Sequence, residues 1–332
     1  MRRVQRYTLR LRSRGVAIRL RYAAAFVMLC GIWGSTWLVI QIGLNGVPPL
    51  LAASLRFVVS SAILLVACVV LRSKLPRGRT EWALVAFYGV VLFGADYGLI
   101  YWGEKNGVVS GLSAVLFATF PFQTAIAAHA LLRSEKLSAQ KLLGIALGFA
   151  GIAFIFRAQL AASADLFFPM FAIVLAATCA AAASVAVKRW GHDMDSVSLN
   201  AFSMGTGAIT LAAASLIVGE TWAVPPWPTG ILAIVYLSVA GSVVAFVTYL
   251  WLLKRIEATS LSYIGFVNPI VAVLLGFIVA KEVLDPLVLA GAGMTLAGIW
   301  LATSKRVGAW IRVAMGTGVV TGDAPDPPQK NA

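Results

Sequence analysis

Long apolar stretches separated by short polar segments make up most of this chain. Each stretch has about 20 residues with almost no charge, the length that a helix needs to cross a hydrocarbon layer about 30 Å thick. A membrane β-barrel would instead show alternating segments of about 10 residues. Lipid offers the backbone no hydrogen-bond partner, so we predict that every stretch is a helix. The ten predicted spans cover residues 22–41, 50–71, 82–103, 107–132, 139–157, 167–187, 197–218, 228–252, 258–280 and 285–304.

Composition agrees with a membrane protein rather than a soluble one. The 332 residues are 60% hydrophobic and only 12% charged. The three cysteines, Cys30, Cys68 and Cys179, fall inside predicted spans and have no spacing typical of disulfide frameworks or metal sites. We therefore predict an all-α integral membrane protein without a metal or other cofactor.

Two parts of the chain repeat each other. The segment from Gly107 to Phe156 recurs from Ile256 to Thr303, and a collinear series of matches indicates an internal duplication. Each half holds five spans, an odd number, so we predict two inverted five-helix repeats, 22–157 and 167–304, around a shared cavity. At a spacing of 147, Glu135, Leu137, Leu142, Gly144, Ala150, Gly151 and Ile152 match Glu282, Leu284, Leu289, Gly291, Ala297, Gly298 and Ile299.

The net charge of +14 would suggest nucleic-acid binding in a soluble protein, but the position of the basic residues explains it otherwise. Of 27 Lys and Arg residues, 23 fall in segment 1–21, in or next to the loops that follow the even-numbered spans, or after span ten. In a ten-span topology all of these segments lie on the same side of the membrane. Basic loops stay cytoplasmic. We therefore expect no nucleic-acid partner and an even number of spans. Segments 1–21 and 305–332 are predicted to be cytoplasmic tails, the second one disordered.

Two ionisable residues lie well inside predicted spans. Asp96 is the only such residue among 13 acidic ones, and Arg56 is the only cation at similar depth, while Glu104 and Lys105 are expected at the outer surface. Charges inside a membrane are costly and are usually paired or functional. We expect either a structural ion pair between Asp96 and Arg56 or a substrate or proton site at Asp96. If Asp96 carries a coupling proton, Asp96→Asn should abolish gradient-dependent transport and leave substrate binding largely intact.

Proline falls at matching places in the two halves. Pro121 and Pro269 each remove one helical hydrogen bond, so we predict bends there. In transporters, interrupted helices tend to border the substrate site. Gly144, Gly148 and Gly151 permit close helix packing, either within one chain or between protomers, so both a monomer and a homodimer fit the sequence.

The motifs together resemble the EamA-type carriers of the drug/metabolite transporter superfamily. They are Trp33-Gly34-Ser35-Thr36, the segment Ser110–Ser113 before a proline, and the duplicated Glu135-Lys136-Leu137 segment with its glycines, and the resemblance covers residues 24–304. It implies a bacterial inner-membrane permease, often an exporter of amino acids, metabolites or drugs. The implied cavity lies between spans one, three, four, six, eight and nine. On that basis we map its lining onto Trp33, Trp37, Tyr97, Tyr101, Phe120, Gln123, Ser184, Tyr249, Tyr263 and Asn268. Span six departs from the family, with Ala180 to Ala183 where an aromatic residue is often found.

Other functions fit the sequence less well. An enzyme would need a cluster of catalytic side chains, and a primary pump would need a nucleotide-binding loop. A channel would show more polarity or a charged ring within the membrane. We therefore expect a secondary active transporter of a small molecule, in contact with membrane lipid, with the proton as a candidate coupling ion. A phosphorylated-metabolite or nucleotide-sugar exchanger is the alternative within the superfamily, although no cluster of Lys and Arg lies at depth to hold phosphate.

Overall fold

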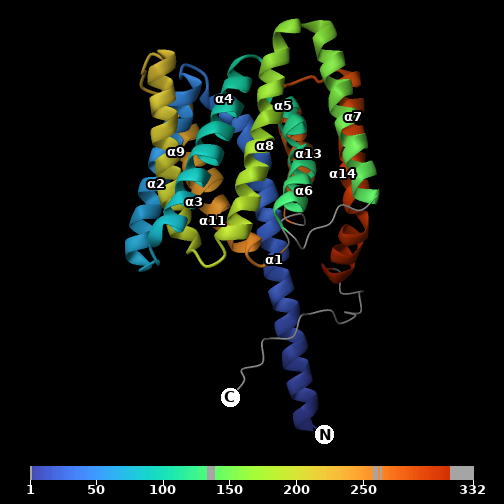
Figure 1. The fold of residues 1–332 in the computed structure, drawn as a ribbon. Helices are drawn as coiled ribbons and strands as arrows, with labels where there is room; N and C mark the ends of the chain where they lie inside the picture. The colour runs from blue at the N-terminus through green and yellow to red at the C-terminus, as the bar shows by residue number, and fades with distance from the viewer. Residues whose placement is uncertain (1, 133–138, 257–260, 262–263, 315–332) are drawn as a thin grey trace. The chain divides into compact units, whose positions relative to one another are not determined.

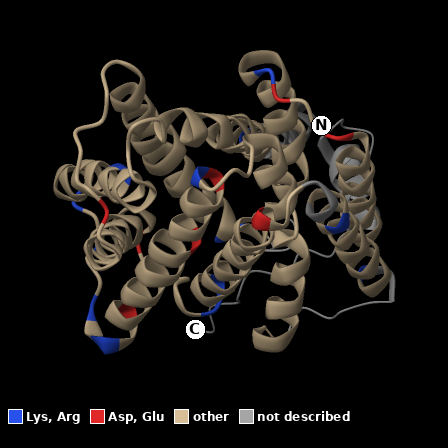
Figure 2. Ribbon diagram, turned by 90° about the horizontal axis from the view of Figure 1, so that it is seen from above, with Lys and Arg blue, Asp and Glu red and all other residues tan. Residues whose placement is uncertain are grey.

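The computed structural model describes the backbone of residues 2–132, 139–256, 261 and 264–314. By its internal contacts the chain divides into a unit of residues 25–302 and a unit of residues 1–24 with 303–332. The described residues contain helices and no strand, as predicted. The helices of residues 25–302 stand side by side in a bundle, and most of the residues on them are uncharged (Figures 1 and 2).

Eight helices among the described residues are long and apolar enough to cross a membrane. Two shorter apolar helices, Ile264–Ala280 and Pro286–Ala302, lie where the ninth and tenth spans are predicted. The elements in chain order are α1 (Arg2–Gly43), α2 (Pro49–Val70), α3 (Gly78–Tyr88), η1 (Gly89–Asp96), α4 (Tyr97–Lys105), α5 (Ser110–Phe117), α6 (Phe120–Leu131), α7 (Ala139–Ala162), η2 (Ala164–Leu166), α8 (Phe167–Trp190), α9 (Ser196–Val218), α10 (Thr229–Ser238), η3 (Val239–Val244), α11 (Ala245–Leu253), α13 (Ile264–Leu275), η4 (Gly276–Ala280) and α14 (Pro286–Ala314).

The helices at both ends of the chain extend beyond the predicted spans. Helix α1 already begins at Arg2, within the segment expected to be a tail, and α14 continues to Ala314, ten residues beyond the predicted end of the last span. The sequence there, up to Arg312, lacks proline, so nothing in it stops the helix at residue 304. The rest of the expected disordered tail, residues 315–332, lies outside the described part of the chain, as does the repeated Glu135-Lys136-Leu137 segment.

The two prolines have different effects on their helices. The fourth span is interrupted, because α5 ends at Phe117 and α6 begins at Phe120. Pro121 lies in the first turn of α6, where its missing N–H costs no helical hydrogen bond. Pro269 lies inside α13, which continues from Ile264 to Leu275. The fourth span is therefore interrupted next to Pro121, whereas α13 continues through Pro269. Membrane helices accept proline where neighbouring groups satisfy the freed carbonyl.

Helices α7 and α14 lie side by side (Figure 1), and they touch at glycines that the duplication makes equivalent. A Cβ atom on Gly144 would lie 2.5 Å from the carbonyl oxygen of Gly298, and one on Gly151 would lie 2.6 Å from that of Gly291. Gly144 corresponds to Gly291 in the repeat, and Gly151 corresponds to Gly298, so each glycine contacts the counterpart of the other. Rising residue numbers in α7 meet falling numbers in α14. The two helices are therefore antiparallel and related by a pseudo-two-fold axis.

The same relation holds for α2 and α9, which pack extensively against each other. Ser54 Oγ donates to the carbonyl of Ala208 at 3.0 Å, and Ser61 Oγ donates to that of Ala201 at 2.8 Å. Residues 54 and 201, and residues 61 and 208, are again 147 positions apart. Thr295, which lies 147 residues after Gly148, donates to the carbonyl of Gly148 at 3.3 Å, near the centre of the α7–α14 contact. The two halves are thus inverted repeats in space as well as in sequence.

Two carboxylates bind the N-termini of helices from the other half of the chain. Glu220 accepts hydrogen bonds from the backbone N–H groups of Leu50 and Leu51 at 3.0 and 2.9 Å. Glu282 accepts from the N–H groups of Ser110 and Gly111, and from the Ser110 hydroxyl at 2.6 Å. These N–H groups have no partner within their own helix, and a negative charge near them is favourable. The two carboxylates therefore link the repeats at one end of the bundle.

We predict that Gly151→Ala destabilises the protein by about 1–3 kcal/mol, because the new methyl group would overlap the backbone of α14. The unfolding temperature of the purified protein in detergent is the measurement. Gly293→Ala in α14 is the matched control, because a Cβ atom there meets nothing within 4 Å. Equal unfolding temperatures for the two variants would contradict the close contact.

Candidate functional site

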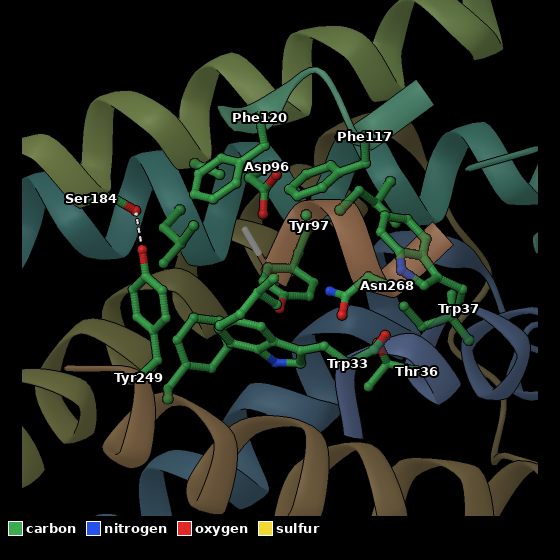
Figure 3. A pocket seen from close by; sticks show the side chains of 17 residues that line it. Trp33, Thr36, Trp37, Asp96, Tyr97, Phe117, Phe120, Ser184, Tyr249 and Asn268 are labelled. Carbon is green, nitrogen blue, oxygen red and sulfur yellow. Dashed lines mark hydrogen bonds between the residues drawn. The ribbon is translucent and has the colours of Figure 1, made fainter. Parts of the chain in front are cut away.

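A cavity lies between the two halves of the bundle (Figure 3). Its empty space is about 690 Å³, counting the part that is open to solvent. The lining comes from α1, η1, α4, α5 and α6 of the first half and from α8, α11 and α13 of the second. The residues are Trp33, Thr36, Trp37, Ile40, Leu92, Asp96, Tyr97, Ile100, Phe117, Phe120, Ala180, Ser184, Phe246, Tyr249, Ile264, Gly265 and Asn268.

Aromatic rings form much of the cavity wall. The ring of Trp33 lies 5.2 Å from those of Phe246 and Tyr249, measured between centroids. Trp37 contacts Phe117 at 5.3 Å, and Phe117 stacks on Phe120 at 5.8 Å. Tilted and edge-to-face contacts of this kind fix the orientation of the rings. The wall is therefore a pre-formed apolar surface.

The duplication also explains why there is space beside these rings. Residues 33 and 180 are 147 positions apart, as are residues 37 and 184, and all four line the cavity. The first half supplies tryptophan at both positions, whereas the second supplies Ala180 and Ser184. Small side chains opposite large ones leave room that two tryptophans on each side would fill. The backbones of the two halves are thus related by pseudo-symmetry, whereas the side chains that line the cavity are not.

Polar groups are few in the cavity, and two of them have unused hydrogen-bonding capacity. Asp96 is 2% exposed, and its Oδ1 atom has no partner among the described residues. The same is true of Asn268 Oδ1 within the described part of the chain. Tyr249 donates its hydroxyl hydrogen to Ser184 at 3.0 Å, so these two groups satisfy each other (Figure 3). Buried polar atoms without a partner are costly, so Asp96 and Asn268 are the candidate polar groups of the site.

Irregular helix places Asp96 in the cavity. It is the last residue of η1, a π-helical segment between α3 and α4. A second π-helical segment, η3, interrupts the third span of the second half between α10 and α11. Such segments are rare and often occur at functional sites. The carbonyl of Gly241 in η3 accepts hydrogen bonds from Trp33 Nε1 at 3.2 Å and from Arg56 at 3.1 Å.

Of the two alternatives predicted for these residues, the direct ion pair between Arg56 and Asp96 is absent among the described residues. Arg56 is fully buried and its Nε donates to Ser242 Oγ at 2.8 Å. The guanidinium carbon Cζ of Arg56 also lies 4.6 Å from the centre of the Tyr97 ring. Hydroxyl, carbonyl and ring groups therefore stabilise the guanidinium in place of the carboxylate, and Arg56 does not line the cavity.

The structure brings Trp33, Trp37, Tyr97, Phe120, Ser184, Tyr249 and Asn268 of the predicted lining together, and it leaves two residues out. The Tyr101 hydroxyl lies 3.5 Å from Arg56 Nη1 and is buried behind the wall. The Gln123 amide donates to Thr119 and to the carbonyl of Val174. Tyr263 lies outside the described residues.

Some residues of the site were not predicted from the sequence. Phe117 and Phe246 line the cavity, but nothing distinguishes them in sequence from other apolar residues of their spans. Glu104 was expected at the outer surface, yet it is 5% exposed, and neither carboxylate oxygen has a partner among the described residues. Because Glu104 lies at the end of an apolar run, it was predicted to be exposed. Residues packed around the helix end bury it instead.

Comparison with known proteins identifies the family. The model of the EamA-like transporter family matches residues 21–157 and again residues 167–304. The chain belongs to this family. It is 31% identical over 274 residues to the "uncharacterized inner membrane transporter YedA" of Escherichia coli K12, covering 82% of this chain and 87% of the relative. A "probable amino-acid metabolite efflux pump" of Salmonella typhimurium is 26% identical, with 81% of this chain and 90% of the relative covered.

A solved crystal structure shares the fold. It has a TM-score of 0.66 at 19% identity and covers 86% of this chain and 98% of its own. With the family match and the apolar helices, this EamA-like protein is a multi-pass membrane transporter.

We predict that Arg56→Lys lowers the stability of this EamA-like transporter by roughly 1.5–3 kcal/mol, the range for hydrogen bonds to a charged group. A lysine has no planar fork to bridge Ser242 and Gly241 or to lie against the Tyr97 ring. Thermal unfolding in detergent is the measurement, and Arg79→Lys, at an exposed position, is the control. An Arg56→Lys variant as stable as the wild type would show that these contacts contribute little.

Proposed function

We propose that the protein is a secondary active carrier that moves a small molecule across the membrane by alternating access. The observation that carries the proposal is a cavity lined by both of two inverted repeats. Inverted repeats can exchange conformations, so that a site between them opens first to one side of the membrane and then to the other. The described lining holds no cluster of catalytic groups, and its aromatic wall suits binding rather than chemistry.

The proposed path of the solute runs through the cavity, with different roles for its two kinds of residue. Trp33, Trp37, Phe120 and Tyr249 would pack against the apolar part of the solute. Asp96 and Asn268 would bind its polar part, because both carry an oxygen without a partner in the described structure. A phosphorylated solute would find no cation among the described residues of the lining, which supports a solute without phosphate.

Direction and driving force are part of the proposal. The relative named as an efflux pump supports export of a metabolite. We propose that a proton gradient drives transport. Asp96 supports this coupling, because it is the one charged residue in the described lining and a carboxylate can carry a proton.

The proposed topology is ten crossings of a bacterial inner membrane with both termini in the cytoplasm. Eight long apolar helices and two shorter ones supply the crossings, and the basic residues gather on one side by sequence.

Filling the cavity should stop transport. We predict that Ala180→Trp reduces flux in proteoliposomes by at least about tenfold at unchanged unfolding temperature, because an indole group would occupy the space opposite Trp33. Leu175→Trp, on an exposed position of the same helix, should transport normally. Efflux of radiolabelled amino acids and amines with and without an imposed pH gradient is the measurement. Normal flux through a folded Ala180→Trp variant would show that this cavity is not the path.

Reporter fusions test the topology separately. A green fluorescent protein at either terminus should fluoresce, and an alkaline phosphatase joined after Asn106, between spans three and four, should be active outside the cytoplasm. Fusions that place the two termini on different sides of the membrane would contradict an even number of crossings.

A further inference from the structure

The charges around the cavity are uneven. Asp96 is the only charged residue in the described lining. The nearby cation, Arg56, donates to Ser242, Gly241 and Tyr101 and does not reach the cavity. Lys105 donates to the carbonyl of Leu44 at 2.9 Å and also stays outside the lining. A solute in the cavity would therefore meet one carboxylate and no cationic donor.

This arrangement distinguishes between the charges that a solute can carry. A solute carboxylate would lose its water and find no positively charged group to bind, which is costly in an apolar cavity. An ammonium group would form a charge-assisted hydrogen bond with the carboxylate of Asp96, which lines the cavity. It would also lie among the faces of aromatic rings, which attract cations at short range. Arg56 opposes that ammonium only through space, because its guanidinium lies against the Tyr97 ring.

We propose that the cavity selects a protonated amine with an apolar or aromatic body, and that Asp96 binds the ammonium group. A zwitterionic amino acid would be disfavoured, because its carboxylate has no partner there. Asn268, the other lining residue with an unpartnered oxygen among the described residues, would bind another polar group of the solute. This inference rests on the carrier function proposed above and specifies its substrate class.

The test is a series of solutes that share a phenyl ring and differ in charge. Phenethylamine is a cation, phenylalanine is a zwitterion and 3-phenylpropionate is an anion at pH 7. We expect the full-length protein in nanodiscs to bind phenethylamine at least about tenfold more tightly than the other two, measured by isothermal titration calorimetry. Equal or tighter binding of phenylalanine or 3-phenylpropionate, or no binding of any member, would overturn the proposal.

Variants then place the preference at Asp96. Asp96→Asn should reduce the tenfold preference to about twofold or less, and Asp96→Glu, which keeps the charge, should retain it. Asp165→Asn, at an exposed position, should behave as the wild type. A folded Asp96→Asn variant that keeps the preference would also overturn the proposal, and if it loses only gradient-dependent transport, Asp96 is a proton site alone. If Asp96→Asn does not fold, the wild-type series and Asp96→Glu still decide the result.

Flux measurements separate this proposal from the carrier function. If phenylalanine crosses proteoliposomes and Ala180→Trp blocks it while phenethylamine does not cross, the carrier function holds and the substrate class is wrong. If no solute crosses, the carrier function itself fails.

Discussion

Contact between helix backbones, across a pseudo-two-fold axis, is the interaction on which this structure depends. Lipid is as apolar as the side chains, so helices gain little by hiding apolar surface and associate through close packing and hydrogen bonds. Here Gly144 and Gly151 let the backbone of α7 touch that of α14, and Ser54 and Ser61 bind carbonyl groups of α9. Gly144 touches the repeat counterpart of Gly151, and Gly151 touches the counterpart of Gly144. A substitution in one half of the chain therefore changes how both halves pack.

The cavity exists because the side chains depart from the symmetry that the backbone keeps. Two tryptophans of α1 face an alanine and a serine at the equivalent positions of α8. Arg56 corresponds to Ser203, which donates to a backbone carbonyl of α3 rather than facing a cavity. The charged residues at depth thus belong to one half only. An inverted frame can support movement between two states, while asymmetric side chains give the site a single chemical character.

Features that many residues determine together, such as helical spans, could be predicted from the sequence, whereas features that a single contact determines could not. The long apolar runs predicted an all-helical membrane protein, and the duplication predicted repeats that the structure relates by a two-fold axis. The lining was predicted less fully, because Phe117 and Phe246 look like any apolar residue until the helices are packed. The burial of Glu104 depends on the neighbours of a helix end, and the partners of Arg56 depend on a π-helical segment, so neither follows from hydrophobic pattern.

The site of Arg56 explains why Asp96 is left facing the cavity. Burying a guanidinium is costly unless its donors are used, and an ion pair is only one way to use them. In this protein the π-helical segment η3 presents Ser242 Oγ and the carbonyl of Gly241, and the Tyr97 ring covers the guanidinium. Dipoles and a ring therefore stabilise the cation without neutralising it through the carboxylate. Asp96 is free of a structural partner as a result, and the chemistry of the cavity follows from the way its neighbour is satisfied.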